Sequence, residues 1–244
     1  MKTTYGLIGY PLSHSFSPAF FKRKFEEEGI DATYQSFPIA SIHELPALLD
    51  MHPELRGLNV TIPYKEKIIP FLDGIDPMAD IIGAVNCIAI DGGKTMGYNT
   101  DYIGFERSLK LWLRGKRPCA IVLGTGGAAR AVTHVLYRLG ISYCQVSRQV
   151  RADCIRYSDI SPDLLADTQL IINTTPLGMF PEIDATPRLP YAAIGQEHLL
   201  FDLIYNPLET KFLSIGRAQG AAVKNGLEML QLQALAGWEI WQRR

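Results

Sequence analysis

Short apolar runs alternate with longer amphipathic segments along the chain, and this alternation predicts an α/β protein with parallel strands. Runs that stop at glycine, proline or polar residues are typical of buried strands, whereas apolar residues three and four positions apart are typical of helices. In the N-terminal part we predict strands over residues 5–8, 33–37, 58–62, 86–90 and 95–98. We predict helices between Ser17 and Gly29, from Ser41 toward Met51, and over residues 65–72.

Local signals refine these elements. Ser17 is expected to cap the first helix because it directly precedes Pro18. Ser41 and Glu44 have the spacing of a capping box. Residues 91–94 read Asp-Gly-Gly-Lys and predict a hairpin between two strands, so we expect this first sheet to be mixed.

A polar segment over residues 114–118 separates this part from a second unit with the same alternation. There we predict strands over residues 119–123, 143–147, 170–174, 199–203 and 221–224. The predicted helices cover residues 102–113, 126–139 and 227–241. Residues 149–167 carry little helical pattern. Two domains of ordinary size fit this layout.

Polar side chains gather where two of the N-terminal strands end. The segment Asn59-Val-Thr61-Ile-Pro63-Tyr-Lys65 leaves an apolar run and presents an amide, a hydroxyl and an ammonium group. Residues 97–101, Gly-Tyr-Asn-Thr-Asp, leave a second strand and add a carboxylate at Asp101. A lone lysine is usually a surface residue. A lysine and an aspartate on adjoining strand ends are able to transfer a proton at a carbonyl or an alcohol.

A glycine-rich turn in the second unit predicts a dinucleotide site. Gly124, Gly126, Gly127 and Ala128 follow a strand and open a helix, whose N-terminal N–H groups can bind a pyrophosphate. Packing alone also produces such turns, but the strand before and the helix after favour cofactor binding.

The end of the next strand indicates which dinucleotide binds. An NAD site usually has an acidic residue there, but this chain has Ser147, Arg148 and Gln149, with no carboxylate before Asp153. A guanidinium can pair with a 2′-phosphate, so NADP is favoured over an ordinary surface role for Arg148. Residues 173–179, Asn-Thr-Thr-Pro-Leu-Gly-Met, place Thr174 at another strand end, on the edge where ligands of open α/β sheets bind.

Composition excludes several other classes of protein. The 244 residues are 47% apolar with a net charge of −1, and no basic run suggests nucleic acid or an anionic membrane. We expect no membrane span and no signal peptide, because no apolar stretch approaches 18 residues and the N-terminus lacks an apolar h-region. The four cysteines and five histidines lack metal-ligand spacing, so we expect reduced core thiols, a cytoplasmic protein and no metal.

Taken together, the motifs resemble the shikimate/quinate dehydrogenase family over nearly the whole chain. The N-terminal motifs are Gly9-Tyr-Pro-Leu-Ser13-His-Ser15-Phe-Ser-Pro18, Asn59-x-Thr61-x-Pro63-x-Lys65, Gly83-Ala-Val-Asn86 and Gly97-x-Asn-Thr-Asp101. The C-terminal motifs are the Gly124 turn, Asn173-Thr-Thr-Pro-x-Gly-Met179, Asp202-Leu-Ile-Tyr205-Asn-Pro207-x-x-Thr210 and Asn225-Gly-x-x-Met229-Leu-x-x-Gln233.

The resemblance implies reversible reduction of 3-dehydroshikimate to shikimate with NADPH, in aromatic amino-acid biosynthesis. It implies that Lys65 and Asp101 are the catalytic pair. The implied substrate-binding residues are Ser13, Ser15, Thr61, Asn86, Gln233 and Tyr205. The implied cofactor-binding residues are Gly124, Gly126, Gly127, Ala128, Ser147, Arg148, Thr174 and Met229.

The resemblance also implies a mixed α/β substrate domain over residues 1–101 and 226–244, and a Rossmann-like parallel-sheet NADP domain over residues 102–225. Three features depart from the family pattern: Cys87 replaces a usual threonine, Ser147 a common asparagine, and the segment 149–167 is short. The alternatives are a quinate/shikimate dehydrogenase that also uses NAD, and a catalytically silent metabolite sensor. The sequence leaves a monomer and a homodimer both open.

Overall fold

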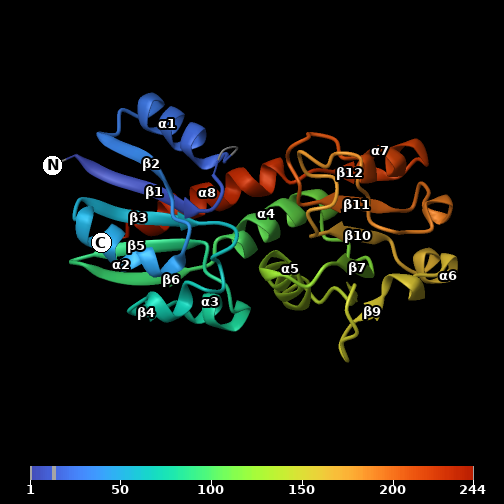
Figure 1. Cartoon of the computed structure of the whole chain (residues 1–244). Coiled ribbons are helices and arrows are strands. Elements are labelled where there is room, and N and C mark those ends of the chain that lie inside the picture. The colour runs from blue at the N-terminus through green and yellow to red at the C-terminus, as the bar shows by residue number, and fades with distance from the viewer. Residues whose placement is uncertain (1, 13–14, 244) are drawn as a thin grey trace. The chain divides into compact units, whose positions relative to one another are not determined.

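The computed structural model describes residues 2–12 and 15–243, whose packing forms two compact α/β units (Figure 1). Unit 1 takes in the chain up to Thr100 and again from Ala234, and unit 2 runs from Asp101 to Gln233. The sequence placed the return to the first domain at residue 226. In the structure the division falls inside helix α8 (Leu227–Trp241), because the first turns of α8 pack with unit 2 and its later turns with unit 1.

The sheet of unit 1 is mixed, as predicted. Its six strands lie in the order β2-β1-β3-β5-β6-β4. Strands β1, β2 and β3 are parallel. Strand β5 is antiparallel to β3, and it is antiparallel to β6 through the predicted hairpin. The strands are β1 (Thr3–Gly9), β2 (Ala32–Pro38), β3 (Leu55–Val60), β4 (Gly74–Ile75), β5 (Cys87–Asp91) and β6 (Lys94–Tyr98).

Helices cover both faces of this sheet. Phe21 and Phe25 of α1 (Ser17–Glu27) share an apolar cluster with Trp241 of α8. On the other face, residues of α2 (Leu45–Met51) and α3 (Pro77–Ile82) pack in a second cluster with Val60 and Ile88. A 3₁₀ turn over Ile42–Glu44 precedes α2. It carries the predicted capping box, in which Glu44 accepts the Ser41 N–H at 2.8 Å.

Three local predictions in unit 1 are wrong. The strand predicted over residues 58–62 ends at Val60, where the ladder with β1 stops, and Ile62 is 65% exposed. The helix predicted over residues 65–72 is a run of turns with a 3₁₀ helix over Ile69–Phe71, since Pro70 has no N–H for an α-helical bond. Phe16, not Ser17, is the N-cap of α1.

Trp241 packs the last turn of α8 against the sheet of unit 1. Its indole Nε1 donates to the Ile88 carbonyl at 2.9 Å, and its ring stacks on Tyr5 at 4.9 Å between centroids. A Cβ added at Gly57 would lie 2.3 Å from the indole nitrogen. Only glycine therefore leaves room on β3 for this side chain.

The sheet of unit 2 is parallel throughout, as predicted, in the order β12-β11-β10-β7-β8-β9. Its strands are β7 (Ala120–Leu123), β8 (Tyr143–Ser147), β9 (Ile155–Arg156), β10 (Leu170–Asn173), β11 (Leu199–Asp202) and β12 (Ala222–Lys224). Its helices are α4 (Asp101–Leu113), α5 (Gly127–Arg138), α6 (Pro162–Ala166) and α7 (Lys211–Ala218). The short segment after β8 holds only β9, a 3₁₀ turn and the five residues of α6.

Alternate residues of the central strands of unit 2 (β7, β10 and β11) face opposite apolar layers. Ala120 and Val122 pack in a cluster with residues of α4 and α5, whereas Ile121 and Leu123 pack in a cluster with residues of α6 and α7. This two-residue period explains why the strands read as continuous apolar runs, since both of their faces are buried.

A buried carboxylate joins three elements at one edge of this sheet. Asp202, at the end of β11, is fully buried and accepts bonds from Asn173 Nδ2 at 3.0 Å and from the Ile204 N–H at 3.1 Å. Its other oxygen accepts from Thr210 Oγ1 at 2.6 Å, the residue that caps α7. Burial raises the pKa of Asp202 to about 6, even though these hydrogen bonds act in the opposite direction.

The raised pKa predicts a pH-dependent stability. Between pH 3.8 and about 6 the folded chain keeps a proton on Asp202 that the unfolded chain releases, so stability falls as pH rises through this window. The free energy of unfolding of the wild type, measured relative to Asp202→Asn, should fall by about 2 kcal/mol from pH 4.5 to pH 7. Urea titrations of both proteins measure this difference, and parallel pH profiles would contradict it.

Candidate functional site

The predicted substrate side chains of unit 1 lie at strand ends that hydrogen bonds hold together. Asn86 is buried directly before β5, where its amide donates to Thr100 Oγ1 at 3.0 Å and accepts the Thr100 N–H at 2.6 Å. Asn99 donates to the Ala84 carbonyl at 2.9 Å. The end of β6 is therefore fixed to the segment before β5, and Asp101 follows Thr100 directly as the first residue of α4.

The loop after β3 is fixed in the same way. The Thr61 N–H donates to the Ile8 carbonyl of β1 at 3.0 Å, and the Lys65 carbonyl accepts the Val85 N–H at 2.7 Å. Thr61 and Lys65 are both partly exposed. Asn59, near the end of β3, accepts a hydrogen bond from the Tyr34 hydroxyl at 2.7 Å, so its amide oxygen links β3 to β2. Within unit 1 the structure thus brings Thr61, Lys65 and Asn86 to neighbouring strand ends.

The structure describes one of the two serines predicted to bind the substrate. Ser13 lies outside the described residues. Ser15 precedes α1, is half-buried, and donates its N–H to the Leu12 carbonyl at 3.3 Å.

In unit 2 the predicted cofactor residues meet where the strand order reverses. The chain passes from β7 to β8 on one side and returns to β10 on the other, so the carboxyl ends of β7 and β10 flank a topological switch point. Gly124 follows β7 with a φ of 114°, a backbone conformation that favours glycine. A Cβ there would lie 2.6 Å from Thr174 Oγ1, which itself donates to the Leu123 carbonyl at 2.6 Å.

The N-terminus of α5 fits a pyrophosphate. Gly126 is the N-cap, no side chain caps the helix, and a Cβ at Gly126 would meet nothing within 4 Å. Gly127 and Ala128 form the first turn, so the helix begins with small residues and backbone N–H groups without a side-chain cap. The residues present at this turn therefore fit a dinucleotide.

The end of β8 carries the predicted specificity residues. Ser147 is buried, and its hydroxyl accepts the Gln149 N–H at 3.0 Å, which shapes the turn. Arg148 is exposed, and within the described chain it has no ion-pair partner. It lies near Tyr157, whose pKa burial raises and the Arg148 charge lowers. The guanidinium is thus available to an anionic ligand.

The remaining predicted residues of unit 2 lie on α8 and after β11. Met229 is buried in the apolar cluster of α4 and α5. Gln233 donates from Nε2 to the Leu230 carbonyl at 2.9 Å. Both residues are close to α4, where a Cβ at Gly104 would lie 2.5 Å from the Met229 carbonyl oxygen. Tyr205 is half-buried, and burial raises its pKa.

Asn173 and Asp202 were not among the predicted site residues, although both lie in the motifs quoted above. Asn173 Oδ1 accepts from the Thr175 N–H at 3.0 Å and from the Thr175 hydroxyl at 2.6 Å, while its amide donates to Asp202. These bonds set the path of the loop that carries Thr174. The signal in the sequence is a polar residue that closes each of the apolar runs Leu170–Asn173 and Leu199–Asp202.

Three further features concern metal sites, membrane helices and the burial of the cysteines. No group of histidine, cysteine, aspartate or glutamate side chains in the described ranges has the arrangement of a metal site. Among the same residues, the structure has no helix with the length and apolar character needed to cross a membrane. The predicted core location of the cysteines holds for Cys87 alone, because Cys119 is exposed and the other two are half-buried.

Comparison with known proteins identifies the family of the chain. The family described as the shikimate dehydrogenase substrate binding domain matches residues 7–88. A shikimate dehydrogenase (NADP(+)) from Clostridium beijerinckii is 40% identical over 253 residues, which cover 98% of this chain and 91% of the relative.

Solved structures give the same result. The shikimate 5-dehydrogenase of Thermus thermophilus, in complex with NADP(H) and shikimate, is 31% identical with a TM-score of 0.87, covering 98% of this chain and 93% of that one. A quinate dehydrogenase from Corynebacterium glutamicum, in complex with NAD, is 28% identical with a TM-score of 0.88, covering 99% and 94%. Similarity of this extent along almost the entire length shows that the chain belongs to the shikimate dehydrogenase family.

Proposed function

We propose that this chain catalyses the reversible NADPH-dependent reduction of 3-dehydroshikimate to shikimate. The observation that carries the proposal is that one chain, a relative of NADP-dependent shikimate dehydrogenases, has both an open glycine turn at a switch point of unit 2 and a lysine-bearing strand end in unit 1. The reaction places the chain in aromatic amino-acid biosynthesis. We propose a cytoplasmic location, which is compatible with the four cysteines that form no disulfide among the described residues.

Lys65 and Asp101 handle the proton in this proposal. Bound NADPH supplies a hydride to the carbonyl carbon of the substrate. A proton must then reach the carbonyl oxygen, and the Lys65 ammonium donates it or stabilises the developing alkoxide. The Lys65 backbone is anchored to Val85, so its side chain starts from a fixed point. Asp101 orients the lysine and accepts a substrate hydroxyl.

The substrate is bound through its carboxylate and ring hydroxyls. Ser13 and Ser15 bind the carboxylate, and Thr61, Asn86, Gln233 and Tyr205 bind the ring. The amide N–H and the amide oxygen of Asn86 both form hydrogen bonds with Thr100, and these bonds hold the side chain in one orientation before the substrate binds. A planar amide with spare acceptor capacity can then receive a ring hydroxyl.

One group of cofactor residues binds the pyrophosphate, and a second group distinguishes NADP from NAD. The N-terminus of α5, with Gly126, Gly127 and Ala128, binds the pyrophosphate, while Gly124 and Thr174 set the strand ends around it. Ser147 shapes the turn that presents Arg148 to the 2′-phosphate. Met229 lies at the nicotinamide side of the site.

The strongest alternative is a quinate/shikimate dehydrogenase that also accepts NAD. The similarity to a quinate dehydrogenase solved with NAD favours it. The exposed Arg148 and the absence of a carboxylate between Ser147 and Asp153 favour the NADP enzyme. A catalytically silent sensor is less well supported, because the chain keeps both Lys65 and Asp101.

The test is an assay of the purified chain with shikimate and NADP⁺, following nicotinamide reduction, with quinate and NAD⁺ as parallel arms. Turnover that is fastest with shikimate and NADP⁺ supports the proposal. Equal kcat/KM for quinate would favour the broader enzyme. No turnover in any arm from folded protein would refute an oxidoreductase of this family and favour the sensor.

Replacing Lys65 with alanine removes the proton donor. We expect kcat to fall by about 10²- to 10⁴-fold with KM for shikimate changed by less than about threefold, because the lost interaction acts mainly in the transition state. Lys67→Ala is the matched control, since Lys67 is an exposed lysine two positions away and should keep full activity. A Lys65→Ala enzyme with raised KM and wild-type kcat would make Lys65 a binding residue only.

Replacing Arg148 with alanine removes the charge for the 2′-phosphate. We expect KM for NADP⁺ to rise by about 10- to 100-fold, the equivalent of one charge-assisted contact, with little change in KM for NAD⁺. Arg151→Ala is the control, because Arg151 is an exposed arginine in the same segment that already pairs with Asp153 at 3.8 Å. An equal effect of Arg148→Ala on both cofactors would contradict the role in selectivity.

A further inference from the structure

A hollow of about 580 Å³ lies in unit 1 beside the last turn of α8. Its lining includes the first residues of β1, Arg56 near the start of β3, and the last residues of β5, which runs antiparallel to β3. Thr61, Lys65 and Asn86 lie beyond the opposite ends of β3 and β5. The hollow is therefore separate from the candidate substrate residues of unit 1, and its volume is in the range of small-molecule sites.

One wall of the hollow is aromatic. The Tyr5 ring stacks on Trp241 with 4.9 Å between centroids, and it contacts Trp238 edge to face at 5.3 Å. Trp238 is partly exposed, and Ile30 from the loop between α1 and β2 extends the apolar lining. Rings of this kind bind another aromatic group by stacked or edge-to-face contacts.

Arg56 supplies a positive charge in a fixed position. Its Nη1 donates to the Pro53 carbonyl at 3.1 Å and to the Leu55 carbonyl at 3.0 Å. The guanidinium has no carboxylate partner among the described residues. Because a guanidinium has five N–H donors, several remain for a ligand after these two bonds are made. Arg243 is a second cation of the lining, and it is likewise exposed and unpaired in the described part of the chain.

Tyr5 adds a buried hydrogen-bond donor. The side chain is 5% exposed, and its hydroxyl oxygen accepts from Gln242 Nε2 at 3.3 Å. The hydroxyl proton has no acceptor within residues 2–12 and 15–243. Burial raises the pKa of Tyr5 and outweighs the opposing effects of Gln242 and Arg56, so the phenol keeps its proton at neutral pH. A ligand oxygen would give this buried O–H the acceptor that it lacks.

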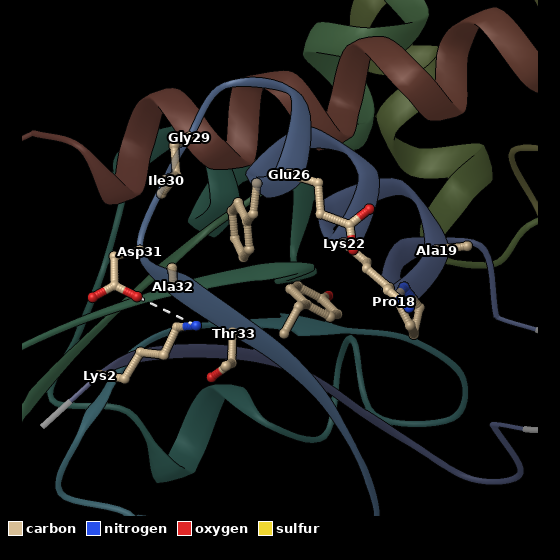
Figure 2. A pocket seen from close by; sticks show the side chains of 12 residues that line it. Lys2, Pro18, Ala19, Lys22, Glu26, Gly29, Ile30, Asp31, Ala32 and Thr33 are labelled. Atoms are coloured by element: carbon tan, nitrogen blue, oxygen red, sulfur yellow. Dashed lines mark ion pairs between the residues drawn. The ribbon is translucent and has the colours of Figure 1, made fainter.

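The charges around the hollow favour an anion. Asp31 pairs with Lys2 at 3.3 Å, so its negative charge is compensated (Figure 2). Asp91, at the end of β5, is exposed and has no ion-pair partner in the described chain. Among the described residues, the unpaired charges of the lining are therefore two guanidinium groups and one carboxylate.

We propose that this hollow binds a small aromatic carboxylate, a single ring joined to a carboxylate group. The ring packs against Trp238 and Ile30. The carboxylate accepts hydrogen bonds from the Arg56 guanidinium and from the Tyr5 hydroxyl. An ammonium group on the same ligand is complementary to Asp91, so the site admits an aromatic amino acid as well as a simple aromatic acid.

The test is isothermal titration calorimetry of the full chain with 3-phenylpropionate, a phenyl ring joined to a carboxylate. Propionate lacks the ring and 2-phenylethylamine lacks the carboxylate, and we expect each to bind at least about tenfold more weakly. L-Phenylalanine adds an ammonium group to 3-phenylpropionate, so the ratio of these two Kd values distinguishes an amino acid from a simple acid. If neither carboxylate with a ring saturates the protein up to about 10 mM, the proposal is wrong.

Two variants locate the binding. Tyr5→Phe removes the hydroxyl but keeps the ring, and we expect the Kd of 3-phenylpropionate to rise by about 3- to 10-fold. Arg56→Gln should raise it by about 10- to 100-fold, because a charged donor is lost. Arg23→Gln is the matched control, since Arg23 is an exposed arginine of α1 that pairs with Glu27 at 3.9 Å and does not line the hollow.

Circular dichroism checks that each variant is folded, and Tyr5→Phe remains informative if Arg56→Gln is not. Excess shikimate should leave the binding of 3-phenylpropionate unchanged, because the proposed substrate residues of unit 1 lie at the opposite strand ends. Binding that both variants leave intact, or that shikimate displaces, would overturn the proposal. The titration does not require turnover, so this site and the proposed reaction can fail independently.

Discussion

The seating of Trp241 against Gly57 is the contact on which the organisation of the chain depends. A helix of fifteen residues, α8, divides its packing between two cores, and the indole is what holds its far end to the first sheet. The hydrogen bond to Ile88 satisfies the indole N–H inside an apolar cluster, where an unmade bond would cost about 1 to 3 kcal/mol. A contact between residues so distant in sequence makes the first and last parts of the chain one folding unit.

Polar networks at strand ends shape both halves of the candidate site. Asn86 with Thr100 in unit 1, and Asn173 with Asp202 and Thr210 in unit 2, are buried groups whose hydrogen bonds are made within the protein. Such groups rigidify the loops that follow each strand, because every alternative loop path would leave a buried polar atom unpaired. Residues that meet ligands can then sit on loops without being loosely held.

Sequence reasoning recovered most strands, and the reasons for its failures are local. The runs Ala120–Leu123 and Leu170–Asn173 were found because burial on both faces leaves a clear apolar signal. Helix α3 was missed although Asp76 caps it, Pro77 opens it and Gly83 closes it, because its six residues are too short for a periodic pattern. The partners of Asp202 were hidden for a different reason. Hydrogen bonds between strands far apart in sequence follow from the sheet order, which a single sequence does not state.

The close approach of Gly124 and Thr174 has a consequence for how this enzyme family can diversify. The turn is confined by a left-handed backbone and by a neighbour 2.6 Å from where a side chain would begin, so almost any substitution there disturbs two strands. Arg148 lies at the end of the next strand but is exposed and packs little. In the proposed function, dinucleotide binding depends on this confined turn and the choice between dinucleotides on the exposed Arg148, so the two tasks fall to residues with opposite tolerance to mutation. Under that proposal, a single substitution at an exposed position changes the preference for one cofactor while the glycine turn stays unchanged.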